Sequence, residues 1–229
     1  MPSNVRAIAF DLDNTLWAVE PVLVRAEARL YAWLGEHCPR ITANLTLEDM
    51  RRAREALARR EPHQAHDFTY LRTTALAGHA REHGYEETIA ARAFEVFLAA
   101  RCEVELFADV RPGLERLRSR FALATLSNGN ADLERIGLAQ WFSLSLNARQ
   151  IGAAKPARLC FERLAEGLGV APASLWYVGD DPYLDVEAAR AAGLGTVWMN
   201  RGAHSWPQDI APADLAVAAL TALAQALGV

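Results

Sequence analysis

The sequence predicts an α/β protein: a Rossmann-like parallel sheet interrupted, just after its first strand, by an all-helical insert. Short apolar runs that end at polar residues alternate with helical segments near both ends of the chain, whereas residues 19–101 show only helical spacing. Strands that alternate with helices imply right-handed crossovers and a sheet covered on both faces. The length of 229 residues, 52% hydrophobic and 23% charged, suits one core with a sizeable insertion.

The expected strands are short and apolar. The first covers residues 5–10 and stops at Asp11, as a buried strand of a parallel sheet would. Further strands are expected at 121–126, 144–146, 175–178 and 196–199. Between them, helices are expected at 112–119, 131–138, 157–168 and 183–192, the last followed by Gly193 as a C-cap.

The insert is predicted to hold four helices, at residues 20–36, 46–60, 66–83 and 86–101. Thr46 and Asp49 stand where a capping box would open the second of these helices. We therefore predict a catalytic core made of residues 1–17 and 105–229, and a helical domain made of residues 18–104.

Composition excludes several classes of protein. A net charge of −4 argues against a nucleic-acid partner, and no apolar run approaches the ~20 residues that span a membrane. The N-terminal residues lack the basic and apolar stretch of a secretory signal. Cys38, Cys102 and Cys160 are far apart and odd in number, which disfavours a disulfide scaffold or a zinc site. We expect a cytoplasmic monomer or homodimer with no membrane partner.

Polar side chains follow three of the predicted strands. These are Asp11 and Asp13, then Ser127 and Asn128, then Asp180 and Asp181, with Asp185 one helical turn further on. Ligands of open parallel sheets bind beyond the carboxyl ends of the strands, so these side chains should gather there. Carboxylates in such numbers need a cation, and Mg²⁺ fits because it uses few carboxylates and leaves positions for a substrate phosphate.

Each side chain then has a chemical role. Asp11 would attack phosphorus as a nucleophile, and Asp13 would protonate the leaving oxygen and later accept a proton from water. Lys155, the single lysine of the chain, would balance the negative charge. The remaining predicted roles are phosphoryl binding by Thr15, Ser127 and Asn128, metal binding by Asp180, and outer-shell support by Asp181 or Asp185. Each residue alone also suits a helix cap or a turn, so the prediction rests on their joint occurrence.

Four segments together resemble the motifs of the haloacid dehalogenase-like (HAD) hydrolase superfamily. They are residues 11–16 (DLDNTL), Ser127-Asn128, Lys155-Pro156 and residues 179–185 (GDDPYLD). The resemblance implies a Rossmann-like core, an aspartyl-phosphate intermediate, Mg²⁺ and a four-helix cap of the C1 type. It also implies metal ligands from Asp11, the Asp13 carbonyl and Asp180. The sequence departs from the pattern at Leu184, where many members carry a polar residue, and in placing the second acid at Asp185.

Within the superfamily, Asp13 argues for phosphoryl transfer, since the dehalogenases replace the second aspartate of the first motif. Phosphonatase-like members need a cap lysine, and this insert has none. Residues 61–67 (EPHQAHD) resemble a bacterial subgroup that dephosphorylates FMN and phosphoribitylaminouracil phosphate of the riboflavin pathway. Trp17 and His66 are then candidates for binding a flat heterocycle; other aromatic residues of the insert, such as Trp33 and Phe68, also suit its hydrophobic core.

The leading hypothesis is a Mg²⁺-dependent phosphomonoesterase of a small phosphorylated metabolite. A phosphosugar mutase, or another nucleotide or sugar phosphatase, stays open as an alternative. A receiver-like signalling module also uses acids, a hydroxyl and a lysine, but the insert and Asp13 argue against it.

Overall fold

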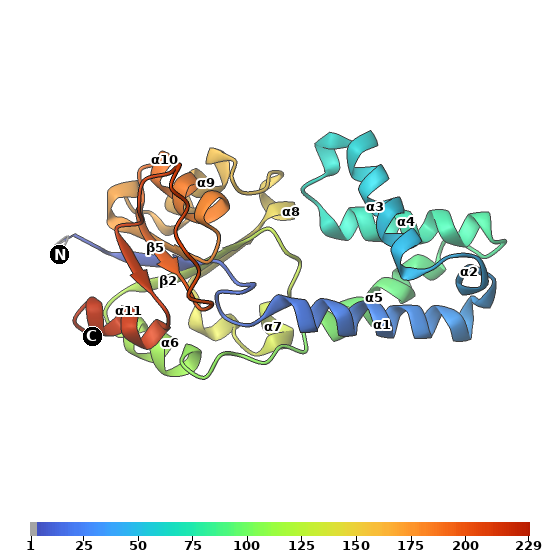
Figure 1. Ribbon diagram of the computed structural model, residues 1–229, viewed down its shortest axis with the longest axis horizontal. Coiled ribbons are helices and arrows are strands. Elements are labelled where there is room, and N and C mark those ends of the chain that lie inside the picture. Colours follow the sequence, from blue (N-terminus) through green and yellow to red (C-terminus); the bar gives the residue numbers. More distant parts are fainter. Residues whose placement is uncertain (1–3) are drawn as a thin grey trace. The chain divides into compact units, whose positions relative to one another are not determined.

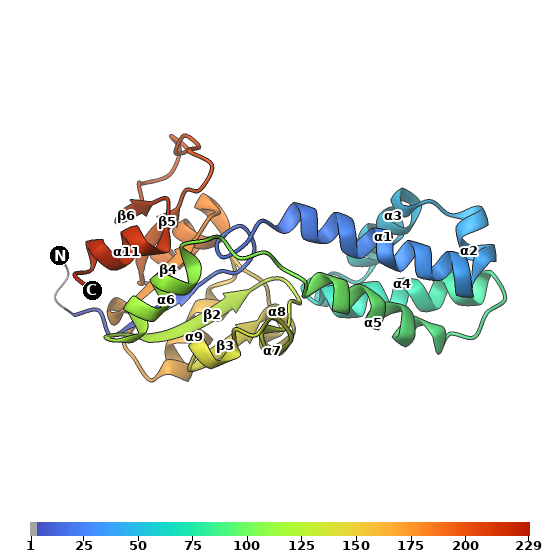
Figure 2. The same cartoon turned by 90° about the horizontal axis from the view of Figure 1, so that it is seen from below.

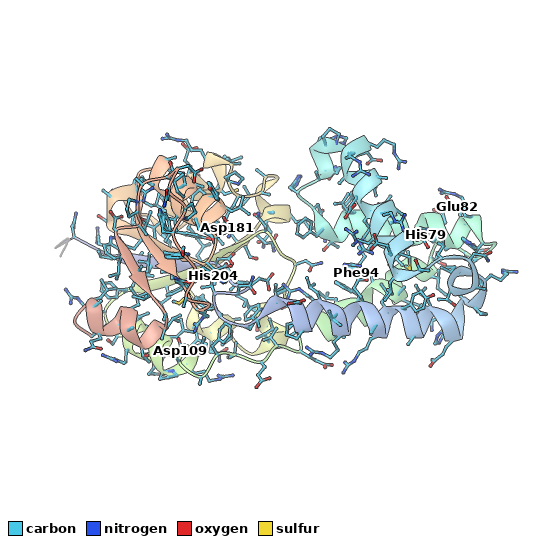
Figure 3. The ribbon with its side chains drawn as sticks, viewed as in Figure 1. His79, Glu82, Phe94, Asp109, Asp181 and His204 are labelled. Atoms are coloured by element: carbon cyan, nitrogen blue, oxygen red, sulfur yellow. The ribbon has the colours of Figure 1, made fainter. Side chains whose placement is uncertain are left out.

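The computed structural model describes residues 4–229 and divides the chain into two units, both visible in Figure 1. The first unit holds the chain up to Ala18 together with Glu105–Gly129 and Gly137–Val229. The second holds Val19–Val104 and, in addition, Asn130–Ile136. In Figure 3, Asp109, Asp181 and His204 mark the first unit, and His79, Glu82 and Phe94 mark the second.

The first unit is built on a six-stranded parallel sheet in the order β3-β2-β1-β4-β5-β6, which confirms the predicted fold class. Its strands are β1 (Ala7–Phe10), β2 (Ala122–Ser127), β3 (Leu144–Asn147), β4 (Leu175–Gly179), β5 (Gly195–Met199) and β6 (Leu215–Val217). The central strand β1 is fully buried, and its Ala9 pairs with Ala124 on one side and Tyr177 on the other. The sequence did not predict β6, because its three apolar residues run without a break into the alanine-rich segment that leads to the last helix, and they are only partly buried or exposed.

Helices cover both faces of this sheet (Figures 1 and 2). Helices α6 (Val110–Arg118) and α11 (Leu220–Ala226) pack against each other on one face, where any side chain at Gly113 would collide with Leu220. Helices α9 (Arg158–Leu168) and α10 (Ala188–Ala191) lie on the other face, and α9 contributes Phe161 and Leu164 to the main hydrophobic core. The unit also contains α8 (Ala148–Ile151) and the short turns η2 (Ala139–Trp141) and η3 (Pro172–Ser174).

The second unit is helical, and it contains every helix predicted for the insert (Figure 2). Its helices are α1 (Val19–His37), α2 (Pro39–Asn44), α3 (Leu47–Arg60), α4 (Phe68–Glu82) and α5 (Ile89–Arg101), with the turn η1 (Pro62–Gln64) and α7 (Leu133–Ile136). Leu30, Leu34, Leu76 and Phe97 pack its core. The short α2 was not predicted. The capping box of α3 is confirmed: Thr46 N donates to Asp49 Oδ2 at 2.9 Å, and Asp49 N donates to Thr46 Oγ1 at 3.1 Å. No helix among residues 4–229 has both the length and the apolar character that crossing a membrane requires.

Asp109, at the start of α6, holds three distant segments of the first unit together (Figure 3). Its carboxylate accepts two hydrogen bonds from Arg201, at 2.9 and 3.1 Å, and one from Leu220 N at 2.6 Å. Arg201 Nε in turn donates to the carbonyl of Thr15 at 2.8 Å. Burial opposes ionisation of Asp109, but the hydrogen bonds from Arg201 and Leu220 outweigh it and lower the pKa of this carboxyl.

We expect the substitution Asp109→Asn to lower the free energy of unfolding by about 1.5–3 kcal/mol at neutral pH, because it removes charge-assisted hydrogen bonds. A carboxyl whose pKa is lower in the folded state stabilises the fold above its unfolded pKa, and the stabilisation is lost as the pH falls through the folded pKa. The difference between wild type and variant should therefore shrink toward about pH 3. Urea unfolding of wild type and variant at neutral pH and at about pH 3 measures this difference.

Glu162→Gln provides the control, since Glu162 pairs with Arg158 at 2.7 Å on the exposed face of α9. This change should have little effect at either pH. An equal loss in the Asp109 variant at neutral and acidic pH would show that the charge of Asp109 does not contribute.

Candidate active site

The loop after β1 is folded tightly against the end of the sheet. Asp11 N donates to Val178 O of β4 at 2.8 Å, and Leu16 N donates to Leu12 O at 2.8 Å. Asn14 takes the left-handed conformation, with φ of 59°, which asparagine tolerates better than most residues. Thr15 is buried, and its hydroxyl has no hydrogen-bond partner among the described residues.

Lys155 lies between two acidic side chains, Asp11 and Asp185, near the ends of β1 and β4. Its buried ammonium donates to Asp11 Oδ1 at 2.5 Å, to Asp185 Oδ1 at 2.6 Å and to the Tyr177 hydroxyl at 3.0 Å. The Tyr177 hydroxyl donates onward to Leu126 O of β2 at 2.8 Å. Three oxygens from three elements therefore fix one ammonium, and Tyr177 links it to the backbone of the sheet.

Burial and neighbouring charges act in opposite directions on the pKa of Lys155 and on the pKa of Asp11. Burial alone would lower the pKa of Lys155, but the charges of Asp11 and Asp185 raise it well above its usual range, so the ammonium persists. Burial raises the pKa of Asp11, and the neighbouring Asp185 carboxylate acts in the same direction against the opposing effect of Lys155. One ammonium cannot neutralise both carboxylates, so the end of β1 carries an excess of negative charge.

Asp180, directly after β4, completes a cluster of three acids. Asp11, Asp180 and Asp185 each offer one carboxylate oxygen, and these atoms all lie within 4.8 Å of one another. Burial, followed by the charge of Asp185, raises the pKa of Asp180 to about 6. A donor set made only of carboxylate oxygens suits a hard divalent cation. The cluster can therefore hold such a cation.

The segment after β4 places its acids by backbone contacts. Asp181 accepts hydrogen bonds from Tyr183 N and Leu184 N, both at 2.8 Å, and so caps the wide helical turn η4 (Pro182–Glu187) that runs into α10. Asp185 Oδ2 accepts from Asp181 N at 3.0 Å, while its other oxygen accepts from Lys155. Because both Asp185 oxygens already accept hydrogen bonds, Asp185 is better suited to supporting a metal site than to direct ligation.

Ser127 is the last residue of β2, and Asn128 follows it at the same edge of the sheet. The Asn128 amide group holds the backbone of Lys155: its Nδ2 donates to Lys155 O at 3.0 Å, and Lys155 N donates to its Oδ1 at 2.7 Å. Ser127 Oγ accepts from Gly129 N at 2.9 Å. Asn128 thus positions the lysine loop, a contact that the sequence does not reveal; phosphoryl binding by Asn128 and Ser127 stays a prediction.

The structure gathers some of the predicted site residues and separates others. Asp11, Lys155, Asp180 and Asp185 lie together, and the supporting role of Asp185 at a metal site stays a prediction. The Asp13 carboxylate is outside the cluster of three acids, and metal binding by its backbone carbonyl stays a prediction.

Trp17 and His66 are the two remaining aromatic candidates for substrate binding. Trp17 is fully buried, and its indole nitrogen donates to Asp13 Oδ1 at 2.8 Å. This contact is a different role from stacking on a heterocycle, for which a fully buried ring has no open face. His66 is half-buried and belongs to the second unit, next to α4.

Sequence reasoning missed Tyr177, whose hydroxyl is the third partner of Lys155. It stands inside an apolar strand, where a tyrosine usually signals packing, and the one available signal was a buried hydroxyl that needs a partner.

The fold and this site define a class of protein: an α/β protein with a parallel sheet that carries a buried lysine and an acidic cluster at the carboxyl ends of its strands. The model of the haloacid dehalogenase-like hydrolase family matches residues 5–193. The chain belongs to this family and is a hydrolase.

Its relatives include named phosphatases and a named dehalogenase. The chain is 29% identical over 200 residues to the 5-amino-6-(5-phospho-D-ribitylamino)uracil phosphatase YigB of Escherichia coli, covering 86% of this chain and 84% of that protein. It is 38% identical over 129 residues to a phosphoserine phosphatase of Thermus thermophilus, covering 54% of this chain and 51% of that protein. A crystal structure described as a 2-haloacid dehalogenase from Pseudomonas syringae pv. Tomato DC3000 superposes with a TM-score of 0.93 at 34% identity, covering 97% of this chain and 98% of that one.

Gly179, the last residue of β4, leaves the space that the Asp185 carboxyl occupies, because a Cβ at this position would collide with that group. We expect Gly179→Ala to displace Asp185 from Lys155 and to lower kcat/KM by about 100-fold, the scale of a 1 Å misplacement at a reacting centre. Phosphate release and thermal unfolding measure the effect.

Gly78→Ala is the matched control. Gly78 lies within α4, and a Cβ there would meet no atom within 4 Å. This variant should keep full activity and gain about 0.5–1 kcal/mol in stability. Full activity of the Gly179 variant would show that the position of Asp185 is unimportant.

Proposed function

We propose that the protein is a Mg²⁺-dependent phosphomonoesterase that hydrolyses a small phosphorylated metabolite through an aspartyl-phosphate intermediate. The observation that carries this proposal is the buried Asp11 carboxylate, held by Lys155 and grouped with Asp180 at the end of β1. The relatives named as phosphatases support the same reaction class.

In the first step, an Asp11 oxygen forms a bond to phosphorus while the bond from phosphorus to the ester oxygen breaks. The electron pair of the broken bond stays on the leaving oxygen, which takes the proton of Asp13. In the second step, Asp13 accepts a proton from water, the water oxygen bonds to phosphorus, and Asp11 leaves as a carboxylate. Inorganic phosphate and the free alcohol are the products.

The chain's own residues prepare this reaction. Lys155 keeps Asp11 in place, and it offers positive charge close to the group that attacks phosphorus. Ser127 and Asn128 stand at the end of the neighbouring strand, where we place the binding of the phosphoryl oxygens.

Asp11, Asp180 and the Asp13 carbonyl would hold Mg²⁺, with Asp185 and Asp181 in support. The fit rests on the oxygen-only donor set of the cluster, whose three carboxylate oxygens lie within 4.8 Å of one another. When bound, Mg²⁺ would neutralise phosphoryl charge and polarise the phosphorus.

The substrate that we favour is phosphoribitylaminouracil phosphate, in line with the name of the YigB relative, or FMN, in line with the resemblance of residues 61–67. The proposal also places the enzyme in the cytoplasm, where its three buried free thiols, Cys38, Cys102 and Cys160, would stay reduced. Conversion of a sugar monophosphate to its isomer in the presence of a bisphosphate activator would instead identify a mutase.

The structural similarity to a protein described as a 2-haloacid dehalogenase favours dehalogenation as a second candidate. A halide leaves without a proton, so dehalogenation gives no use to a general acid at Asp13. An alkoxide leaving group requires one. Asp13 therefore favours phosphoryl transfer over dehalogenation.

The test is phosphate release from p-nitrophenyl phosphate and from a panel that includes FMN, phosphoribitylaminouracil phosphate and sugar phosphates. We expect turnover with Mg²⁺, its loss with EDTA, and a fall of at least about 1,000-fold in Asp11→Asn, because the nucleophile is removed. Chloride release from 2-chloropropionate is measured in parallel.

Glu162→Gln, on the exposed face of α9, is the control that should keep wild-type rates. Halide release without phosphate release would identify a dehalogenase. A phosphorylated Asp11 that persists for hours without turnover of any ester would identify a signalling module.

A further inference from the structure

Trp17 lies beside Asp13 because the loop after β1 turns back on itself. Asp13 and Trp17 form a parallel β-bridge, and Asn14 N donates to Trp17 O at 2.7 Å. The left-handed conformation of Asn14 makes this reversal possible. As a result the indole Nε1 of Trp17 donates to Asp13 Oδ1 at 2.8 Å.

The position of the indole is fixed from several sides. The ring is fully buried, and the backbone of Trp17 forms an antiparallel bridge with Leu106. On the residue before it, Leu16 O accepts from Phe107 N at 3.1 Å. A donor held by its own burial and by the neighbouring backbone can hold its acceptor in one orientation.

We propose that Trp17 is a positioning residue that orients the Asp13 carboxyl for proton transfer to the leaving oxygen; this inference rests on the proposed phosphatase function. An indole N–H can only donate, so Oδ1 of Asp13 acts as an acceptor both before and after the proton is transferred. The proton of the acid is then carried on Oδ2. When the phosphorus–oxygen bond breaks, Oδ2 gives this proton to the leaving oxygen and Asp13 becomes a carboxylate, with the bond from Trp17 retained.

This role predicts a dependence on the leaving group. Phenolate is a poor leaving group and needs the proton as the bond breaks, whereas p-nitrophenolate is stabilised by its nitro group and leaves with little help. Phenyl phosphate and p-nitrophenyl phosphate have nearly the same shape, so their comparison isolates the proton transfer. A merely structural role of Trp17 would affect both esters alike.

The experiment compares kcat/KM of the two esters in wild type and in Trp17→Phe, which keeps an aromatic ring and removes the N–H donor. We expect a loss of about 10–100-fold with phenyl phosphate and of less than about threefold with p-nitrophenyl phosphate. Because the result is a ratio within one preparation, a reduced folded fraction cancels from it.

Trp141→Phe is the matched control, since the buried Trp141 Nε1 has no hydrogen-bond partner among the described residues. It should leave the ratio at the wild-type value. In an Asp13→Asn background, Trp17→Phe should cause no further loss with phenyl phosphate, because residues that act together are not additive.

Equal losses with both esters, or additive losses in the double variant, would overturn the role of Trp17. Failure of the proposed function looks different, since then the wild type itself turns over neither ester.

Discussion

One buried ammonium holds the end of the sheet together. Lys155 contacts Asp11 after β1, Tyr177 within β4 and Asp185 in η4. Removing a partner from a buried charged group of this kind leaves uncompensated charge and typically costs about 3–5 kcal/mol. The relative positions of the three elements at this edge therefore depend on the lysine, and the Asn128 amide group fixes the backbone of the lysine itself.

Lys155 and the three acids around it explain why the site would bind a cation and then an anion. Lys155 supplies one positive charge, whereas Asp11, Asp180 and Asp185 bring three carboxyl groups within 4.8 Å of one another. Burial, followed by the charge of Asp185, raises the pKa of Asp180 to about 6. A divalent cation would balance the negative charge of the acids, and the added positive charge would then favour a phosphate ester. The electrostatics of the acids would thus link the proposed metal binding to the proposed substrate binding.

Much of this arrangement follows from the sequence, because carboxyl ends of parallel strands meet at one edge of a sheet. That rule was enough to bring Asp11 and Asp180 into one site, whereas Lys155 was assigned to it by its charge. The rule could not predict contacts that depend on exact packing. The Tyr177 hydroxyl accepts from Lys155 although it stands in an apolar strand, and the Trp17 indole donates to Asp13. Residues 130–136 were likewise expected in the core, but Arg135 pairs with Glu95 of α5 at 2.5 Å, within the helical unit.

The choice of lysine at position 155, in a chain whose other basic residues are all arginine, has a physical reason in this geometry. Its three acceptors surround one nitrogen at 2.5, 2.6 and 3.0 Å, and the side chain is almost completely buried. An ammonium is compact and directs three protons to three separate oxygens, whereas a guanidinium is planar and wider. Arginine would have to push Asp11 and Asp185 apart to enter the same space. The position therefore accommodates the compact ammonium of lysine but not the planar guanidinium of arginine, and Asp11 stays close to Asp180 and Asp185 because the cation beside it is small.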